Sequence, residues 1–146
     1  YFLTERVYYH HTKVIVGSMI SKALEFALTI GLTEKELLYQ SDGSFLNLIA
    51  SKCPDSLTLI NAVNNRNLFK RAYILTYQNC PTGIPERLIE QFASSITSRN
   101  QTELKIAELA GIPPALVILY CSALPANKEA AVKVQSISGW HPFNQI

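Results

Sequence analysis

Residues 14–30 read VIVGSMISKALEFALTI, and this stretch decides the fold. At 3.6 residues per turn its apolar side chains cover most of the circumference of a helix. The polar stripe is narrow and consists of Ser18, Lys22, Glu25 and Thr29. A helix with so little polar surface packs against neighbours on several sides. The pattern therefore predicts one long central helix over residues 4–30, which Gly31 ends.

The start of this helix is a chemically rich segment, ERVYYHHTK at residues 5–13. It gathers aromatic rings, two imidazoles and cations within about three helical turns. Side chains three and four residues apart share a helix face, so Arg6 is expected near His10, and Tyr8 near His11. Such a surface suits a sugar, a base or a phosphate, but Glu5 is its only carboxylate, and a hydrolytic metal site needs several. It predicts the edge of an active site without its centre.

The composition narrows the class of protein. A chain of 146 residues is long enough for one domain with a real core. With 48% apolar and 16% charged residues it is too apolar to be disordered. The mean hydropathy of +0.11 favours burial against more protein, including further copies in a homo-oligomer. The net charge of +2, without a basic run, gives no evidence for nucleic acid, and no apolar run reaches the ~18 residues that a membrane span needs.

Cysteine usage and the N-terminus indicate a cytoplasmic protein. The three cysteines, Cys53, Cys80 and Cys121, are far apart and odd in number, so they form no disulfide framework and no zinc motif. The N-terminus has no signal-peptide pattern and no initiator methionine. We therefore expect residues 1–146 to be a single fragment of a larger cytoplasmic protein.

The remaining elements follow from capping residues, proline, glycine and the apolar period. The predicted helices are 34–39, capped by Thr33 with Glu36 in a capping box, 45–52, 55–65, 86–98 after Pro85, and 102–110 before Gly111. The predicted strands are 72–77, 115–123 and 131–137, followed by an irregular tail at 138–146. The fold class is thus α+β, a mainly α-helical N-terminal part with a long central helix followed by a smaller mixed part with about three strands.

Three short motifs occur in an informative order. The first is RVYYHHTK at residues 6–13, running into GSMI at 17–20 and Ala23-Leu24. The second is Leu32-Thr33 with Leu37-Leu38, and the third is NRNLFKR at residues 65–71. Together they resemble HD-domain phosphohydrolases of the deoxynucleoside triphosphate triphosphohydrolase-like branch. The resemblance covers about residues 4–78.

This resemblance implies a larger enzyme. The family builds its metal centre from a His, a His-Asp pair and a distant Asp, and no His-Asp pair occurs in this chain. We therefore expect the catalytic half upstream of Tyr1, with residues 1–68 continuing that HD domain and residues 69–146 forming an α+β appendage. The parent would use a divalent metal (Mg, Mn, Fe or Ni). We expect this chain itself to contain no catalytic or metal-ligating residue, to hold no cofactor and to be inactive alone.

The resemblance also implies three substrate-binding residues, Arg6, Tyr8 and His10. The ring of Tyr8 would pack against a deoxyribose, and Arg6 would supply a cation for phosphate. The alternative interpretation makes Tyr8, Tyr9 and His11 amphipathic core residues at the helix start. Metal binding by His10 and His11 is disfavoured, because adjacent helical side chains diverge by about 100°.

Arg66, Lys70 and Arg71 form a second cationic group that could bind a phosphate. Cations at a helix end, which complement its dipole, are commoner, and we favour that interpretation.

The expected function is that of a C-terminal portion of an HD-type phosphohydrolase acting on nucleotides or phosphate esters. It would supply one pocket wall and an assembly or regulatory appendage, with the upstream HD domain, further copies of the chain and a nucleotide as partners and no membrane. The alternative is a non-catalytic helical protein-interaction module, whose long apolar helix pairs with a partner chain.

Overall fold

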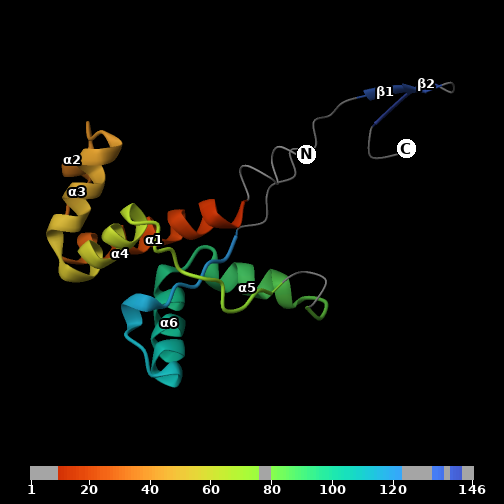
Figure 1. Ribbon diagram of the computed structural model, residues 1–146. Coiled ribbons are helices and arrows are strands. Elements are labelled where there is room, and N and C mark those ends of the chain that lie inside the picture. Colours follow the sequence, from red (N-terminus) through yellow and green to blue (C-terminus); the bar gives the residue numbers. More distant parts are fainter. Residues whose placement is uncertain (1–9, 76–79, 123–132, 137–138, 143–146) are drawn as a thin grey trace.

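The computed structural model describes residues 10–75, 80–122, 133–136 and 139–142. In these ranges the chain forms six α-helices, a short 3-10 helix (η3) and one β-hairpin (Figure 1). Their bounds are α1 His11–Thr29, α2 Glu34–Leu37, α3 Asp42–Lys52, α4 Pro54–Asn64, α5 Ile84–Phe92, α6 Ile96–Ala110, η3 Pro114–Leu116, β1 Lys133–Ser136 and β2 Gly139–Pro142. None of the helices in the described ranges is both long and apolar enough to cross a bilayer.

Local signals set most helix ends. Gly31 has φ 98° just after α1, and the Leu32 N–H donates to the Ala27 carbonyl at 3.1 Å, which confirms the predicted glycine end. Gly111 has φ 66° and ends α6 in the same way. The predicted capping box is also present, because the Glu36 carboxylate accepts the Thr33 backbone N–H at 2.8 Å.

Two boundaries differ from the prediction because a serine caps the helix. Residues 41–44, which precede the helix predicted over 45–52, are the N-cap and first turn of α3, and the Ser41 hydroxyl accepts the Ser44 N–H at 3.4 Å. Similarly, the Ser95 hydroxyl accepts the Ser98 N–H at 3.2 Å and starts α6. The helix predicted to run through residue 98 therefore ends at Phe92, and Asn100 lies inside α6 rather than at a break.

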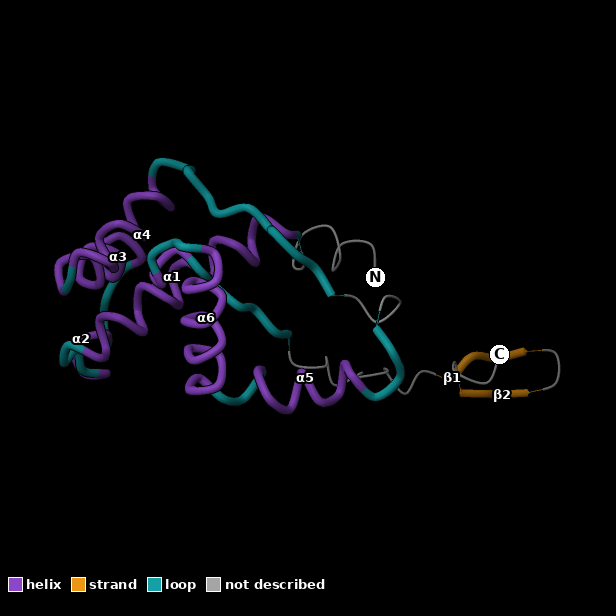
Figure 2. Tube along the Cα trace, turned by 90° about the horizontal axis from the view of Figure 1, so that it is seen from below, coloured by secondary structure: helices purple, strands orange, loops and turns teal. Residues whose placement is uncertain are grey.

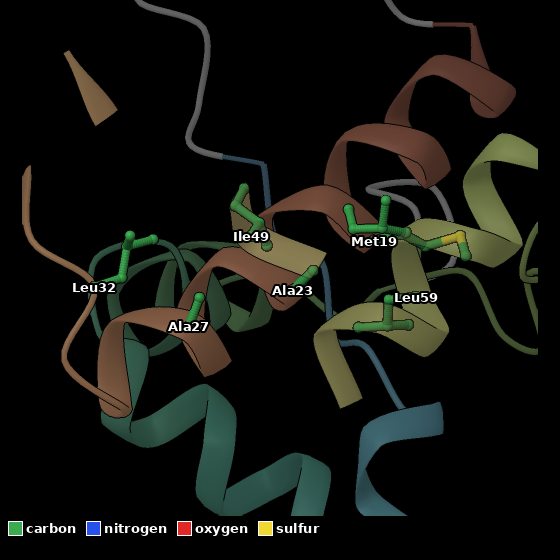
Figure 3. Close-up of a cluster of buried hydrophobic side chains, with 7 residues drawn as sticks. Met19, Ala23, Ala27, Leu32, Ile49 and Leu59 are labelled. Carbon is green, nitrogen blue, oxygen red and sulfur yellow. The ribbon is translucent and has the colours of Figure 1, made fainter. Parts of the chain in front are cut away.

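The apolar core lies where α1 packs against α3 and α4 (Figure 3). Its fully or nearly buried members are Met19, Ala23, Ala27, Leu32, Ile49, Leu59 and Ile60. The two small alanines of α1 allow α4 to approach closely, and the buried Ser56 hydroxyl of α4 donates to the Ala23 carbonyl at 2.8 Å. Ile49 of α3 and Leu32, which follows α1, complete the cluster. Packing against more than one neighbour explains why α1 is apolar on more than one side.

The α+β prediction is wrong, because two of the three expected strands are absent from the described residues. Residues 72–75 form no strand, and all four side chains are exposed. The apolar run at 115–122 forms η3 and a stretch without regular structure. Its residue Ile118 packs against the helical core, so this run is apolar because it covers α-helices and not because it pairs in a sheet. Residues 76, 77 and 123 of these expected strands lie outside the described ranges.

The third expected strand corresponds to β1, but its partner was not anticipated. β1 pairs antiparallel with β2, with Lys133 opposite Pro142 and Ser136 opposite Gly139. The tail expected to be irregular therefore supplies β2. The structure is a helical fold with one two-stranded hairpin among its described residues, and it contains no mixed part with three strands.

The tie between α2 and α3 has a testable dependence on pH. Lys52 Nζ donates to one Glu36 oxygen at 2.8 Å, and the Thr33 N–H and hydroxyl donate to the other at 2.8 and 2.9 Å. These bonds, with that from Lys52 first, lower the pKa of Glu36 from 4.5 to about 2. Since the folded-state pKa is depressed, the stabilising effect is complete above about pH 4.5 and is lost as pH falls towards 2.

We expect a carboxyl-detected NMR titration of Glu36 to show a midpoint near 2, and Lys52→Met to move that midpoint towards 4.5. The solvent-exposed first-turn residue Asp42 serves as the control for general effects of the substitution. A wild-type midpoint near 4.5 for Glu36 would contradict the predicted bonding.

Candidate functional site

The start of α1 places His10 and His11 side by side. His10 is the N-cap residue, with φ −60° and ψ 131°, and its Nδ1 accepts the Thr12 backbone N–H at 3.3 Å. Because His10 lies outside the helical conformation, its side chain does not diverge from that of His11, and the two ring centroids are 4.3 Å apart. The divergence of about 100° expected for two adjacent helical residues does not apply here, because His10 is not helical.

A groove of about 360 Å³ lies beside this helix start. The first turns of α1 line one side, and the connection between α4 and α5 lines the other; Figure 2 shows this connection passing the beginning of α1. The lining residues are His11, Thr12, Ile15, Leu68, Phe69, Lys70 and Arg71. Leu68 and Phe69 pack against the core cluster, so they fix the backbone that presents Lys70 and Arg71 to the groove.

The groove is electrostatically positive. No acidic residue occurs in the first turn of α1, so the positive end of the helix dipole is not compensated there. Lys70 and Arg71 are exposed, and neither forms an ion pair with another described residue. Together with His11 they make a surface that attracts phosphate or carboxylate oxygens.

The three cations near residue 70 separate into two roles. Arg66 lies just past the end of α4 in the left-handed region, with φ 55°, and does not line the groove. It fits the interpretation of a cation at a helix end. Lys70 and Arg71 lie well beyond that helix end and face His11, so the helix-end interpretation does not describe them.

The predicted substrate-binding residues are only partly described. His10 is exposed at the start of α1, next to the groove. Arg6 and Tyr8 lie outside the described residues, as does the part of the long helix predicted before residue 10. Their assignment as pocket residues stays a prediction.

A second polar cluster was not predicted as a unit. Lys22 of α1 is 8% exposed and donates to the carboxylate of Glu103, which is 4% exposed, and to Asn100 Oδ1 at 2.9 Å, both in α6. Glu25 lies 3.7 Å from Lys22 and accepts from Arg99 at 3.2 Å. We call these five residues the α1–α6 clasp. One signal of this cluster was present in the sequence. Lys22 lies on a helix that is apolar nearly all round, so its charge needs a partner from another part of the chain.

Neither a metal site nor an activated Cys121 thiol is evident among the described residues. No three His, Cys, Asp or Glu side chains in the described ranges converge where they could hold an ion. Burial raises the pKa of the Cys121 thiol, and the nearby Arg99 charge opposes that shift only in part. Binding through the cationic groove is therefore the chemistry that this part of the chain supports best.

The comparison with protein families shows which family the chain belongs to. The sequence matches the family described as the HD associated region over residues 1–146. The chain belongs to the HD-associated region family. No curated protein and no solved structure matches it. This HD-associated region is an accessory region of an HD-domain protein, which confirms the association with an HD domain expected from the sequence motifs.

Proposed function

We propose that this HD-associated region forms one wall of the substrate pocket in a cytoplasmic, metal-dependent phosphohydrolase that acts on nucleotides, of the deoxynucleoside triphosphate triphosphohydrolase-like branch. The observation that carries the proposal is the cationic groove at the start of α1, with Lys70 and Arg71 opposite His11. Arg6 and Tyr8 immediately precede this groove in the sequence. The wall thus combines cations for phosphate with a flat ring for a sugar face.

His10 contributes a directed hydrogen-bond donor. Its Nδ1 accepts the Thr12 N–H, so a neutral His10 carries its proton on Nε2. The outward Nε2–H can donate to a phosphate oxygen, whereas the other tautomer would place two hydrogen atoms between Nδ1 and Thr12. The helix N-cap therefore fixes both the position and the proton of this side chain.

The hydrolytic metal is assigned to the HD domain of the parent protein. A bound divalent ion would polarise the phosphoryl oxygen and generate the attacking hydroxide. The described part of the HD-associated region does not bring together a ligand set for this ion. What this chain's residues do is bind phosphate at Lys70, Arg71 and His10, and pack against the sugar at Tyr8.

The proposal is tested by Tyr8→Ala in the full-length parent. Loss of the ring contact is expected to lower kcat/KM for nucleoside triphosphates by about 10–100-fold, because burying such a ring is worth roughly 1.5–3 kcal/mol. The metal content should be unchanged, since the ring contacts sugar and not metal. Steady-state kinetics and metal analysis on the same sample provide the measurement.

Tyr39→Ala is the matched control, because Tyr39 is fully exposed at the end of α2 and should leave kinetics unchanged. Metal loss together with activity, or an unchanged kcat/KM for Tyr8→Ala, would contradict the assignment of Tyr8. The isolated 146-residue chain is expected to show no turnover with Mg²⁺, Mn²⁺, Fe²⁺ or Ni²⁺ supplied.

A further inference from the structure

Two groups of helices share almost no apolar core. The main cluster consists of residues from α1, α3, α4 and Leu32, and none of the described residues of α5 or α6 belongs to it or packs against it. Phe92 of α5 and Ala107 of α6 are buried outside that cluster. Figure 1 shows α5 and α6 below α1. Burial of apolar surface in the main cluster therefore does not hold α5 and α6 against α1.

The contacts that join the two groups are polar and local. Lys22 reaches Asn100 and Glu103, and Glu25 reaches Arg99, so the clasp ties one turn of α1 to the first half of α6. The second Glu103 oxygen accepts the Leu119 backbone N–H at 2.8 Å. One buried carboxylate therefore holds both α6 and the segment at residues 117–122.

A pocket that is partly open to solvent adjoins the clasp. It has a volume of about 310 Å³ and lies between α1, α6 and residues 118–120. Small residues of α1, including Gly17 and Ser21, form part of its wall, and a Cβ atom built on Gly17 would meet nothing within 4 Å. This space gives α6 room to shift relative to α1 without first displacing core side chains.

We propose that α5 and α6 form a separable lobe that opens from α1 as a unit, with Lys22 and Glu103 as its latch. Residues 117–122 stay on the core, because Ile118 packs against the core cluster. Opening exposes the charges of Lys22 and Glu103 to water. Their hydration free energy, which is lost when the lobe closes, is then recovered. Opening uncovers little of the core cluster, because no described apolar side chain of α5 or α6 packs against it. The core of α1, α3 and α4 stays intact in both states.

Amide hydrogen exchange on the full 146-residue chain tests this proposal. In the wild type, amides of α6 and Leu119 should share one opening rate and exchange at least about tenfold faster than those of Ala23 and Leu59. Lys22→Met leaves the Glu103 carboxylate without its buried partner. It should accelerate exchange in the lobe by a further factor on the order of 100, with no change in α3 and α4.

Lys52→Met is the matched control, because it removes a lysine from a partly exposed ion pair with Glu36 and should leave the lobe unchanged. The double variant Lys22→Met/Glu103→Leu replaces the latch by apolar side chains. Amides of α6 should then exchange no faster than in the wild type. Equal acceleration of α4 and α6 in Lys22→Met, or complete unfolding of that variant, would show one cooperative unit and overturn the proposal. Slower exchange in wild-type α6 than in α4 would overturn it as well.

Discussion

Glu103→Ala is expected to destabilise the attachment of α6 by about 3 kcal/mol, at the lower end of the range for breaking a buried ion pair. The substitution leaves the Lys22 ammonium group buried, with Glu25 still 3.7 Å away, and it removes the acceptor of the Leu119 N–H. Urea denaturation followed by far-ultraviolet circular dichroism should show the loss in the transition that removes α5 and α6.

Glu36→Ala is the control for removing a carboxylate from an ion pair, because Glu36 and Lys52 are more exposed than Glu103 and Lys22. Water screens such a pair, and its removal should have a smaller effect. A loss for Glu103→Ala that is no larger than for Glu36→Ala would contradict the assignment of Glu103 as the buried anchor of α6.

Met19→Ala is expected to lower the free energy of unfolding of the α1–α3–α4 core by about 2–5 kcal/mol. Met19 is fully buried in the core cluster, so truncation leaves a cavity and removes apolar contacts (Figure 3). The same urea titration measures it, as a lower midpoint for the transition of the core helices. Leu109→Ala provides the control, since Leu109 is 89% exposed on α6 and should change stability by less than about 0.5 kcal/mol. Equal effects of the two substitutions would place Met19 outside the core.

Structural features that depend only on residues close together in the sequence were predictable. The Thr33–Glu36 capping box, the glycine ends of α1 and α6, and Pro85 in the first turn of α5 all depend on neighbouring backbone groups, and the structure confirms them. The serine caps at Ser41 and Ser95 belong to the same class of signal. Their side chains bond within the chain segment, and weighing them more strongly would have corrected the boundaries of α3 and α6.

The strands were mispredicted because residue type does not distinguish a segment that pairs with another strand from one that covers helices. Residues 115–122 have the apolar and β-branched composition of a buried strand, yet Ile118 packs on helices and Leu119 donates to a side chain. A strand exists only where another strand offers hydrogen bonds, and that information lies elsewhere in the chain. β2 escaped prediction for the same reason, since its pairing with β1 and not its composition makes it a strand.

The candidate site was predictable in part. The sequence indicated that the segment around His10 is suited to ligands, and the structure places His10 and His11 exposed at a helix start. It could not indicate that Lys70 and Arg71 lie opposite, because only folding brings residues 11 and 70 to one groove. The clasp depends on a still longer separation, with Lys22 and Glu103 81 residues apart.

That separation also restricts how sequences with this fold can diverge. A neutral residue at position 22 strands a buried carboxylate at position 103, and a neutral residue at 103 strands a buried ammonium group, so neither change is neutral alone. We therefore expect the two positions to vary together. Among relatives that keep the contact between α1 and α6, they should be charged together or apolar together, and a mixed pair should mark a chain in which α6 is attached differently.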